Sequence, residues 1–92
     1  MTTDTKSILM FGANWCGDCR RAKRFFDEHH IDYEWIDVDK NPEAAVHVQE
    51  INKGMRSIPT IIFPDGSILV EPSNSELAKK LGLQQERWRL PG

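Results

Sequence analysis

Two cysteines separated by two residues are the part of this sequence best suited to chemistry. Cys16 and Cys19 follow an apolar run at 8–11 and precede a helical pattern at 20–30. A pair at this spacing, between a strand and a helix, is typical of a thiol–disulfide redox site. Residues three apart share one helix face, so the two sulfurs can form a disulfide. The unpaired N–H groups and the positive end of a helix favour the thiolate of Cys16, which is the nucleophilic form.

A metal-binding role and a purely structural role both fit the cysteine pair less well. A zinc site would need a second pair of Cys or His residues at zinc-ligand spacing, and the sequence offers none. A structural role for two buried cysteines would not account for the strand and turn that precede them. The adjacent His29 and His30 fit a favourable charge at a helix C-terminus better than a metal or proton-transfer role. We therefore predict Cys16 as the nucleophile, Cys19 as the resolving thiol, and no metal site.

The composition limits both the size of the fold and the class of partner. A chain of 92 residues can form one domain with a modest core. We predict a single domain over 1–92, with its core at about 7–83 and a polar tail at 84–92. Trp88 in this tail fits docking on its own domain or contact with a partner equally well. Twelve basic and fourteen acidic residues give a net charge of −2, which predicts no nucleic-acid partner.

The N-terminus and the cysteine usage indicate a cellular compartment. Residues 1–6 are polar and lack the apolar run of a signal peptide. The longest apolar runs hold only a few residues, far short of a membrane span. Two cysteines in such a chain are more often transiently oxidised and catalytic than joined in a structural disulfide. We expect a cytoplasmic protein that does not act at a membrane.

Patterns of apolar and capping residues predict the elements that position the cysteines. They predict strands at 7–12, 31–38, 60–63 and 68–70, and helices at 20–30 and 42–53. Asn41 and Pro42 are typical of the start of the second helix. Ser73 and Glu76 form a Ser-x-x-Glu capping box for a third helix, which Gly82 ends. A right-handed crossover makes the first two strands parallel neighbours, and the last two strands form a hairpin.

Two motifs together resemble the glutaredoxin family of the thioredoxin superfamily. They are Trp-Cys-Gly-Asp-Cys at 15–19 and Arg-Ser-Ile-Pro at 56–59, and the resemblance covers 7–83 and is closest to the mycoredoxin-like branch. It implies a thioredoxin-like α/β fold, with a four-stranded mixed sheet of order 2-1-3-4 flanked by three helices. It also implies a dithiol thiol–disulfide oxidoreductase that reduces protein disulfides, or mixed disulfides between proteins and a small thiol.

The resemblance also implies roles for residues around the cysteines. Trp15 would form an exposed apolar wall beside the nucleophile. The less favoured alternative is a core position, because tryptophan is often largely buried. The bond before Pro59 would be cis, and the backbone of Ile58 would pair with the substrate. Arg56 matches a position that can reach a carboxylate of the thiol, although a solvated surface arginine fits nearly as well. Ser57 completes this predicted substrate-binding loop.

Asp18 departs from the family pattern, which usually has an aromatic residue there in contact with the thiol substrate. A carboxylate this close to Cys16 opposes thiolate formation, and Arg20 and Arg21 could offset it. An acid in the first helical turn also stabilises the helix dipole. Both effects can operate together, and we include Asp18 among the substrate-binding residues.

Two further departures concern the small thiol. Ala13 stands where glutathione-dependent members often have lysine, and Glu-Pro-Ser-Asn at 71–74 replaces a Gly-Gly-acid segment. These differences favour mycothiol or another small thiol over glutathione as a co-substrate, with no tightly bound cofactor. Direct reduction by an NADPH-dependent flavoprotein reductase is an alternative. A second alternative is an iron–sulfur cluster held by Cys16 of two chains and two small thiols. We expect a monomer that acts on disulfide-containing proteins.

Overall fold

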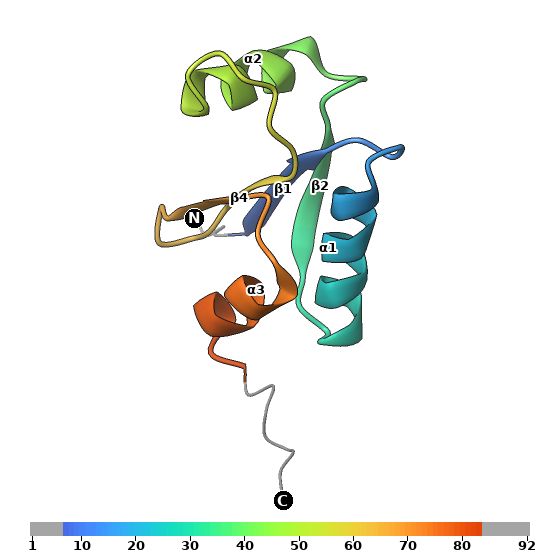
Figure 1. Ribbon diagram of the computed structural model, residues 1–92, viewed down its shortest axis with the longest axis vertical. Coiled ribbons are helices and arrows are strands. Elements are labelled where there is room, and N and C mark those ends of the chain that lie inside the picture. The colour runs from blue at the N-terminus through green and yellow to red at the C-terminus, as the bar shows by residue number, and fades with distance from the viewer. Residues whose placement is uncertain (1–6, 84–92) are drawn as a thin grey trace, which may run out of the picture.

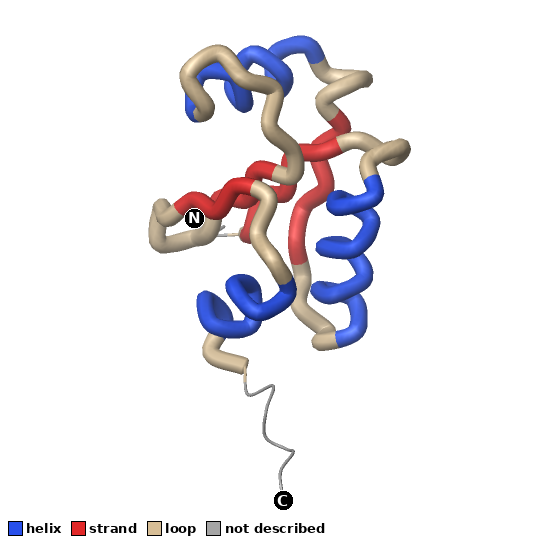
Figure 2. The backbone as a smooth tube through the Cα atoms, in the orientation of Figure 1, coloured by secondary structure: helices blue, strands red, loops and turns tan. Residues whose placement is uncertain are grey.

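The computed structural model describes residues 7–83, which form a mixed sheet with helices around it (Figure 1; Figure 2). The strands are β1 (Ile8–Gly12), β2 (Tyr33–Asp37), β3 (Thr60–Ile62) and β4 (Ile68–Val70), and the helices are α1 (Gly17–Glu28), α2 (Pro42–Ile51) and α3 (Asn74–Leu81). The sheet order is β2-β1-β3-β4. β1 is parallel to β2 and antiparallel to β3, and β4 is antiparallel to β3. The predicted fold and strand order are confirmed.

Helices cover both faces of this sheet. α1 and α3 pack on one face, where Phe26 and Leu77 join Met10 of β1 in the core. α2 packs on the other face, where Val48 meets Phe11 of β1. Figure 1 shows α2 above the sheet and α3 below it. β1 is therefore covered on both sides, as its continuous apolar sequence predicts, and its end presents the next residues at a fixed place.

Helix α1 begins and ends earlier than its sequence pattern predicts. It spans Gly17–Glu28 rather than 20–30. The start is earlier because the sulfur of Cys16 accepts a hydrogen bond from the N–H of Cys19, as a capping oxygen would. The end is earlier because His30 adopts a left-handed backbone conformation, with φ of 58°, beyond the helix C-terminus. The helix thus starts directly after the predicted nucleophile.

Helix α2 also ends before its predicted boundary. The sequence pattern predicts 42–53, but the helix spans Pro42–Ile51. Lys53 adopts the left-handed conformation, with φ of 56°, and Gly54 after it also has a positive φ, of 94°. The side chain of Asn52 donates a hydrogen bond to the carbonyl oxygen of Val48 and so satisfies one of the last helical acceptors.

Helix α3 has the predicted caps at both ends. The hydroxyl of Ser73 accepts from the N–H of Glu76 at 3.1 Å, and the carboxylate of Glu76 accepts from the N–H of Ser73 at 2.8 Å. Gly82 closes the helix in the left-handed conformation, with φ of 71°. The predicted tail at 84–92, Trp88 included, lies outside the described residues, as does the lead at 1–6.

Replacing Ser73 by alanine should lower the free energy of unfolding by about 1 kcal/mol, since it removes the N-cap hydrogen bond of α3. Urea unfolding followed by circular dichroism measures this change. The matched control is Ser75→Ala, because Ser75 is an exposed serine of the same helix and lies outside the capping box. Its effect should stay within about 0.5 kcal/mol. Equal losses in both variants would contradict the capping role.

Candidate active site

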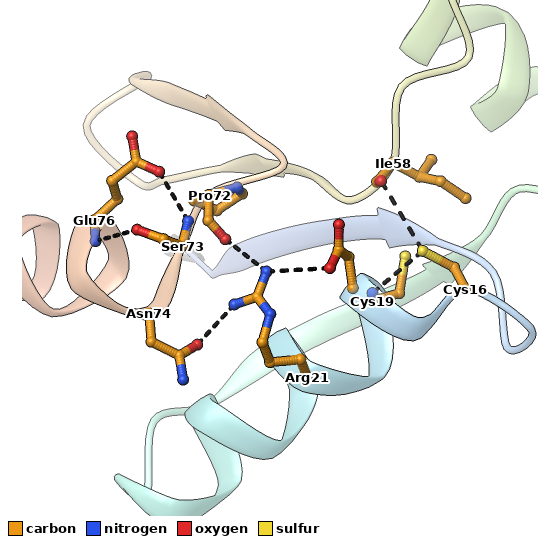
Figure 3. A network of polar contacts seen from close by, with 9 residues as sticks. Cys16, Cys19, Arg21, Ile58, Pro72, Ser73, Asn74 and Glu76 are labelled. Carbon is orange, nitrogen blue, oxygen red and sulfur yellow. Dashed lines mark hydrogen bonds and ion pairs between the residues drawn. The ribbon is translucent and has the colours of Figure 1, made fainter.

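Cys16 lies in the turn between β1 and α1, with backbone groups around its sulfur. The N–H of Cys19 donates to this sulfur at 3.2 Å, and the carbonyl oxygen of Ile58 lies 4.0 Å from it (Figure 3). The N–H of Cys16 donates to the carbonyl oxygen of Ala13 at 3.1 Å and closes the turn. The sulfur of Cys16 is therefore the N-cap of α1 and satisfies one of the N–H groups at the start of the helix.

The second cysteine sits in a closed environment. Cys19 has no exposed surface, whereas Cys16 keeps 9% of its surface exposed, so an outside reagent reaches Cys16 first. A Cβ atom added at Gly12 would lie 2.6 Å from the sulfur of Cys19 and 2.9 Å from the ring of Trp35. Only a glycine leaves room for both groups. Burial raises the pKa of the Cys19 thiol from 9.0 to about 12, and its hydrogen bond with Cys16 adds to the rise.

The loop before β3 is tied to the end of α2 by a buried threonine. The hydroxyl of Thr60 donates to the carbonyl oxygen of Ser57 at 2.6 Å and accepts from the side-chain amide of Asn52 at 3.1 Å. The peptide bond between Ile58 and Pro59 is cis, as the resemblance implies. These contacts hold the carbonyl oxygen of Ile58 beside the sulfur of Cys16. The contribution of Ser57 to this loop is therefore its backbone carbonyl oxygen, which accepts the hydrogen bond from Thr60.

A carboxylate joins two of the predicted substrate-binding side chains. Asp39 Oδ2 accepts from the indole N–H of Trp15 at 2.7 Å, and Asp39 Oδ1 lies 3.6 Å from the guanidinium of Arg56. Trp15 remains 68% exposed, which excludes the core position that the sequence left open. Beside these side chains is a cavity of about 130 Å³, lined by Trp15, Val38, Ala45, Val48, Arg56 and Ile58.

On the other side of the cysteines, Arg21 links α1 to the start of α3. Its guanidinium donates to the carbonyl oxygen of Pro72 at 2.8 Å and to the side chain of Asn74 at 2.7 Å (Figure 3). It also lies 3.7 Å from the exposed carboxylate of Asp18. Arg20 instead donates to a carbonyl oxygen in the active-site turn. Of the two arginines proposed to offset Asp18, Arg21 is the one in contact with it.

Three residues of this site do not follow from the sequence patterns: Gly12, Trp35 and Asp39. The sequence indicates an exit-loop acid at Asp39 and ordinary strand bulk at Trp35. A usable signal existed, because β1 and β2 are parallel and their carboxyl ends lie at one sheet edge. Trp15 follows one strand and Asp39 follows the other, so the two were candidates for contact. The sequence carries no such signal for Gly12, because only the packed structure shows that the sulfur of Cys19 and the ring of Trp35 occupy the space beside it.

The described residues bring together the parts of a thiol–disulfide exchange site. One cysteine is accessible at a helix start, the second is buried one turn later, and a backbone carbonyl before a cis-proline faces the first. Among residues 7–83, no three His, Cys, Asp or Glu side chains gather in a way that could hold a metal ion. No helix in that range is both long and apolar enough to cross a membrane. This arrangement is that of a thioredoxin-like thiol–disulfide oxidoreductase.

Comparison with known proteins identifies the family. The family model described as Glutaredoxin matches residues 8–68. A protein of Mycobacterium tuberculosis that is named as a glutaredoxin is 38% identical over 77 residues, covering 84% of this chain and 92% of the relative. Mycoredoxin 1 of Corynebacterium glutamicum is 31% identical over 75 residues, covering 82% and 92%. The chain therefore belongs to the glutaredoxin family, in its mycoredoxin-like branch, and is a thiol–disulfide oxidoreductase.

Solved structures agree with this assignment. A glutaredoxin from Methanosarcina mazei superposes with a TM-score of 0.70 and 26% identity, covering 84% of this chain and 79% of the other. A glutaredoxin from Archaeoglobus fulgidus superposes with a TM-score of 0.68, covering 84% and 87%. At 22% identity, this second similarity shows the fold alone.

Iodoacetamide at pH 7 should modify Cys16 in the Cys19→Ser variant far faster than Cys19 in the Cys16→Ser variant. The thiolate is the reacting form, and the raised pKa of Cys19 lowers its thiolate fraction at pH 7. Burial is the largest cause of this rise and survives the loss of Cys16. Alkylation of Cys19 should accelerate as the pH rises above 7, because its thiolate fraction then increases.

The control for this measurement is the same pair of variants in denaturant, where the two cysteines should react at similar rates. Similar rates in the folded variants at pH 7 would contradict the closed environment of Cys19.

Proposed function

We propose that this protein reduces protein disulfides, and mixed disulfides between proteins and a small thiol, through a two-cysteine cycle. The observation that carries the proposal is the difference between the two sulfurs. Cys16 is accessible and receives an N–H at a helix start, whereas Cys19 is enclosed and remains a thiol. One sulfur is thus suited to attack an outside disulfide, and the other to act only after a bond to Cys16 has formed.

The cycle begins at the accessible sulfur. The Cys16 thiolate attacks one sulfur of the substrate disulfide, forms a mixed disulfide, and releases the other sulfur as a thiolate that takes up a proton. Cys19 then loses its proton and attacks the sulfur of Cys16. The Cys16–Cys19 disulfide forms and the second substrate thiol leaves protonated. Two electrons have passed from the protein to the substrate, and two molecules of a small thiol return them as they become one disulfide.

The substrate groups close to Cys16 follow from the same geometry. The carbonyl oxygen of Ile58 lies 4.0 Å from the sulfur and can accept an N–H of a substrate segment that lies along this loop. Trp15 forms the exposed apolar wall, and Arg56 is close enough to meet a substrate carboxylate or carbonyl. We propose Asp18, Trp15, Arg56, Ser57, Ile58 and Pro59 as the residues that surround the bound substrate.

Cys16→Ser should abolish exchange, whereas Cys19→Ser should retain activity on the mixed disulfide formed with hydroxyethyl disulfide. An outside thiol can replace the resolving step but not the first attack. Reduction of hydroxyethyl disulfide, coupled to oxidation of added thiol, measures both variants. Reduction of a protein disulfide should be lost in both variants. Substantial activity of Cys16→Ser on any disulfide would overturn the assignment of the nucleophile.

We propose further that mycothiol, or another small thiol unlike glutathione, returns the electrons. Ala13 is fully buried and brings no cation to the site. The carbonyl oxygen of Pro72 and the side chain of Asn74 are bonded to Arg21, so the start of α3 is already occupied by the protein's own arginine. Asp18 adds an exposed negative charge. Each feature disfavours glutathione, which is anionic, more than a sugar-based thiol with fewer carboxylates.

The reductant is tested by oxidising the protein and measuring its reduction by mycothiol, by glutathione, and by a thioredoxin reductase with NADPH. Losing one charge-assisted contact costs about 1.5–3 kcal/mol, so glutathione should react roughly ten- to a hundred-fold more slowly than mycothiol. Asp18→Asn should speed glutathione more than Glu28→Gln, a matched loss of charge at the far end of α1. Fastest reduction by glutathione would refute this choice, and reduction by the reductase alone would establish the electron-carrier alternative.

We place this cycle in the cytoplasm, where thiols are kept reduced, and we expect a monomer that meets its protein substrates one at a time. Purified protein should be colourless. Absorbance in the visible range would instead indicate the iron–sulfur alternative, in which Cys16 of two chains binds a cluster.

A further inference from the structure

The cavity beside Trp15 is an apolar site that the exchange reaction itself does not require. Its walls are the side chains of Val38, Ala45, Val48 and Ile58, and its rim carries Trp15 and Arg56. Its volume is about 130 Å³. An apolar cavity of about 150 Å³ can take up benzene, so this one has room for a single apolar side chain.

The two rim side chains are fixed by one carboxylate. Asp39 uses one oxygen for the indole N–H of Trp15 and turns the other toward Arg56, at 2.7 Å and 3.6 Å. Trp15 is thereby held in a fixed place at the edge of the cavity while 68% of its surface stays exposed. Asp39 is therefore a positioning residue that acts through Trp15 and Arg56.

The cavity adjoins the reacting sulfur. Ile58 contributes to its wall, and the carbonyl oxygen of the same residue lies 4.0 Å from the sulfur of Cys16. An extended chain rises about 3.3 Å per residue. A substrate segment that presents its cysteine to Cys16 therefore places a residue one or two positions away at the cavity.

From this geometry we propose that the cavity binds a branched aliphatic side chain, Leu, Ile or Val, within two residues of the reacting cysteine of a protein substrate. Small thiols have no such side chain beyond the sulfur, so the cavity distinguishes protein disulfides from the co-substrate. The proposal rests on the proposed function, since it concerns the substrate of the same reaction.

The test uses peptides of glycine and serine with one cysteine in a mixed disulfide with cysteamine. Leucine is placed one or two positions before or after this cysteine, and each peptide is compared with its asparagine counterpart. The second-order rate constant for reaction with reduced wild-type protein is measured. At one position, leucine should react about ten-fold faster than asparagine.

Ala45→Leu should abolish this preference, because the larger side chain fills the cavity from α2. The matched control is Val46→Leu, on the exposed side of the same helix, which should keep the preference. Asp39→Ala should also weaken the preference by freeing Trp15 and Arg56, and it serves if Ala45→Leu does not fold. Equal rates for leucine and asparagine at all four positions in wild-type protein would overturn the proposal.

Hydroxyethyl disulfide separates the exchange reaction from the side-chain preference, because it has no side chain for the cavity. If wild-type protein reduces neither it nor the peptides, the proposed function fails. If wild-type protein reduces it and all peptides without preference, only the cavity proposal fails. A wild-type dimer in sedimentation that Ala45→Leu dissociates would also overturn the proposal, since a second chain would then occupy the cavity.

Discussion

The hydrogen bond from the N–H of Cys19 to the sulfur of Cys16 is the interaction on which this site depends. It makes a cysteine the cap of α1, so the proposed nucleophile is also the residue that caps the helix. For this bond to form, the end of β1 must be fixed, which its burial between α2 and the α1–α3 layer achieves. The loop before β3 brings the carbonyl oxygen of Ile58 to 4.0 Å from the same sulfur. The hydrogen bonds of Thr60 with Asn52 and Ser57 hold this loop in place.

The chemical difference between the two sulfurs comes from packing rather than from charge. Cys19 packs in a cluster with Ala13, Cys16, Trp35 and Ile58. Its sulfur fills the space that is left because Gly12 has no side chain. Lys23, which lies on the same helix as Cys19, places its ammonium 4.0 Å from the centre of a Trp35 ring. This contact helps to hold the ring that closes the site, because an ammonium group over an indole is attracted to the face of the ring. A dry, enclosed thiol then remains protonated until Cys16 has reacted.

A basic side chain, Arg21, and an acidic side chain, Asp39, fix the contacts on the two sides of Cys16. On one side, Arg21 binds the first residues of α3, so those backbone and side-chain oxygens are satisfied within the protein. On the other side, Asp39 holds an exposed tryptophan and leaves an apolar cavity next to it. The first side is closed by internal hydrogen bonds, whereas the second offers apolar surface and a carbonyl oxygen.

The sequence by itself determined the four strands, the three helices and the identity of both cysteines, because apolar periodicity, capping residues and the Cys-x-x-Cys spacing are local signals. The full strand order came from the resemblance to the glutaredoxin family. The sequence also placed Ile58 and Pro59 opposite the cysteines through their resemblance to a known motif. The apolar pattern alone began α1 at residue 20 rather than at Gly17, because such a pattern does not reveal a sulfur that caps the helix. Tertiary structure alone decided that Gly12 makes room for Cys19, that Asp39 holds Trp15, and that Arg21 occupies the start of α3. Each joins residues from different elements, and such contacts depend on how the elements pack, which no local pattern encodes.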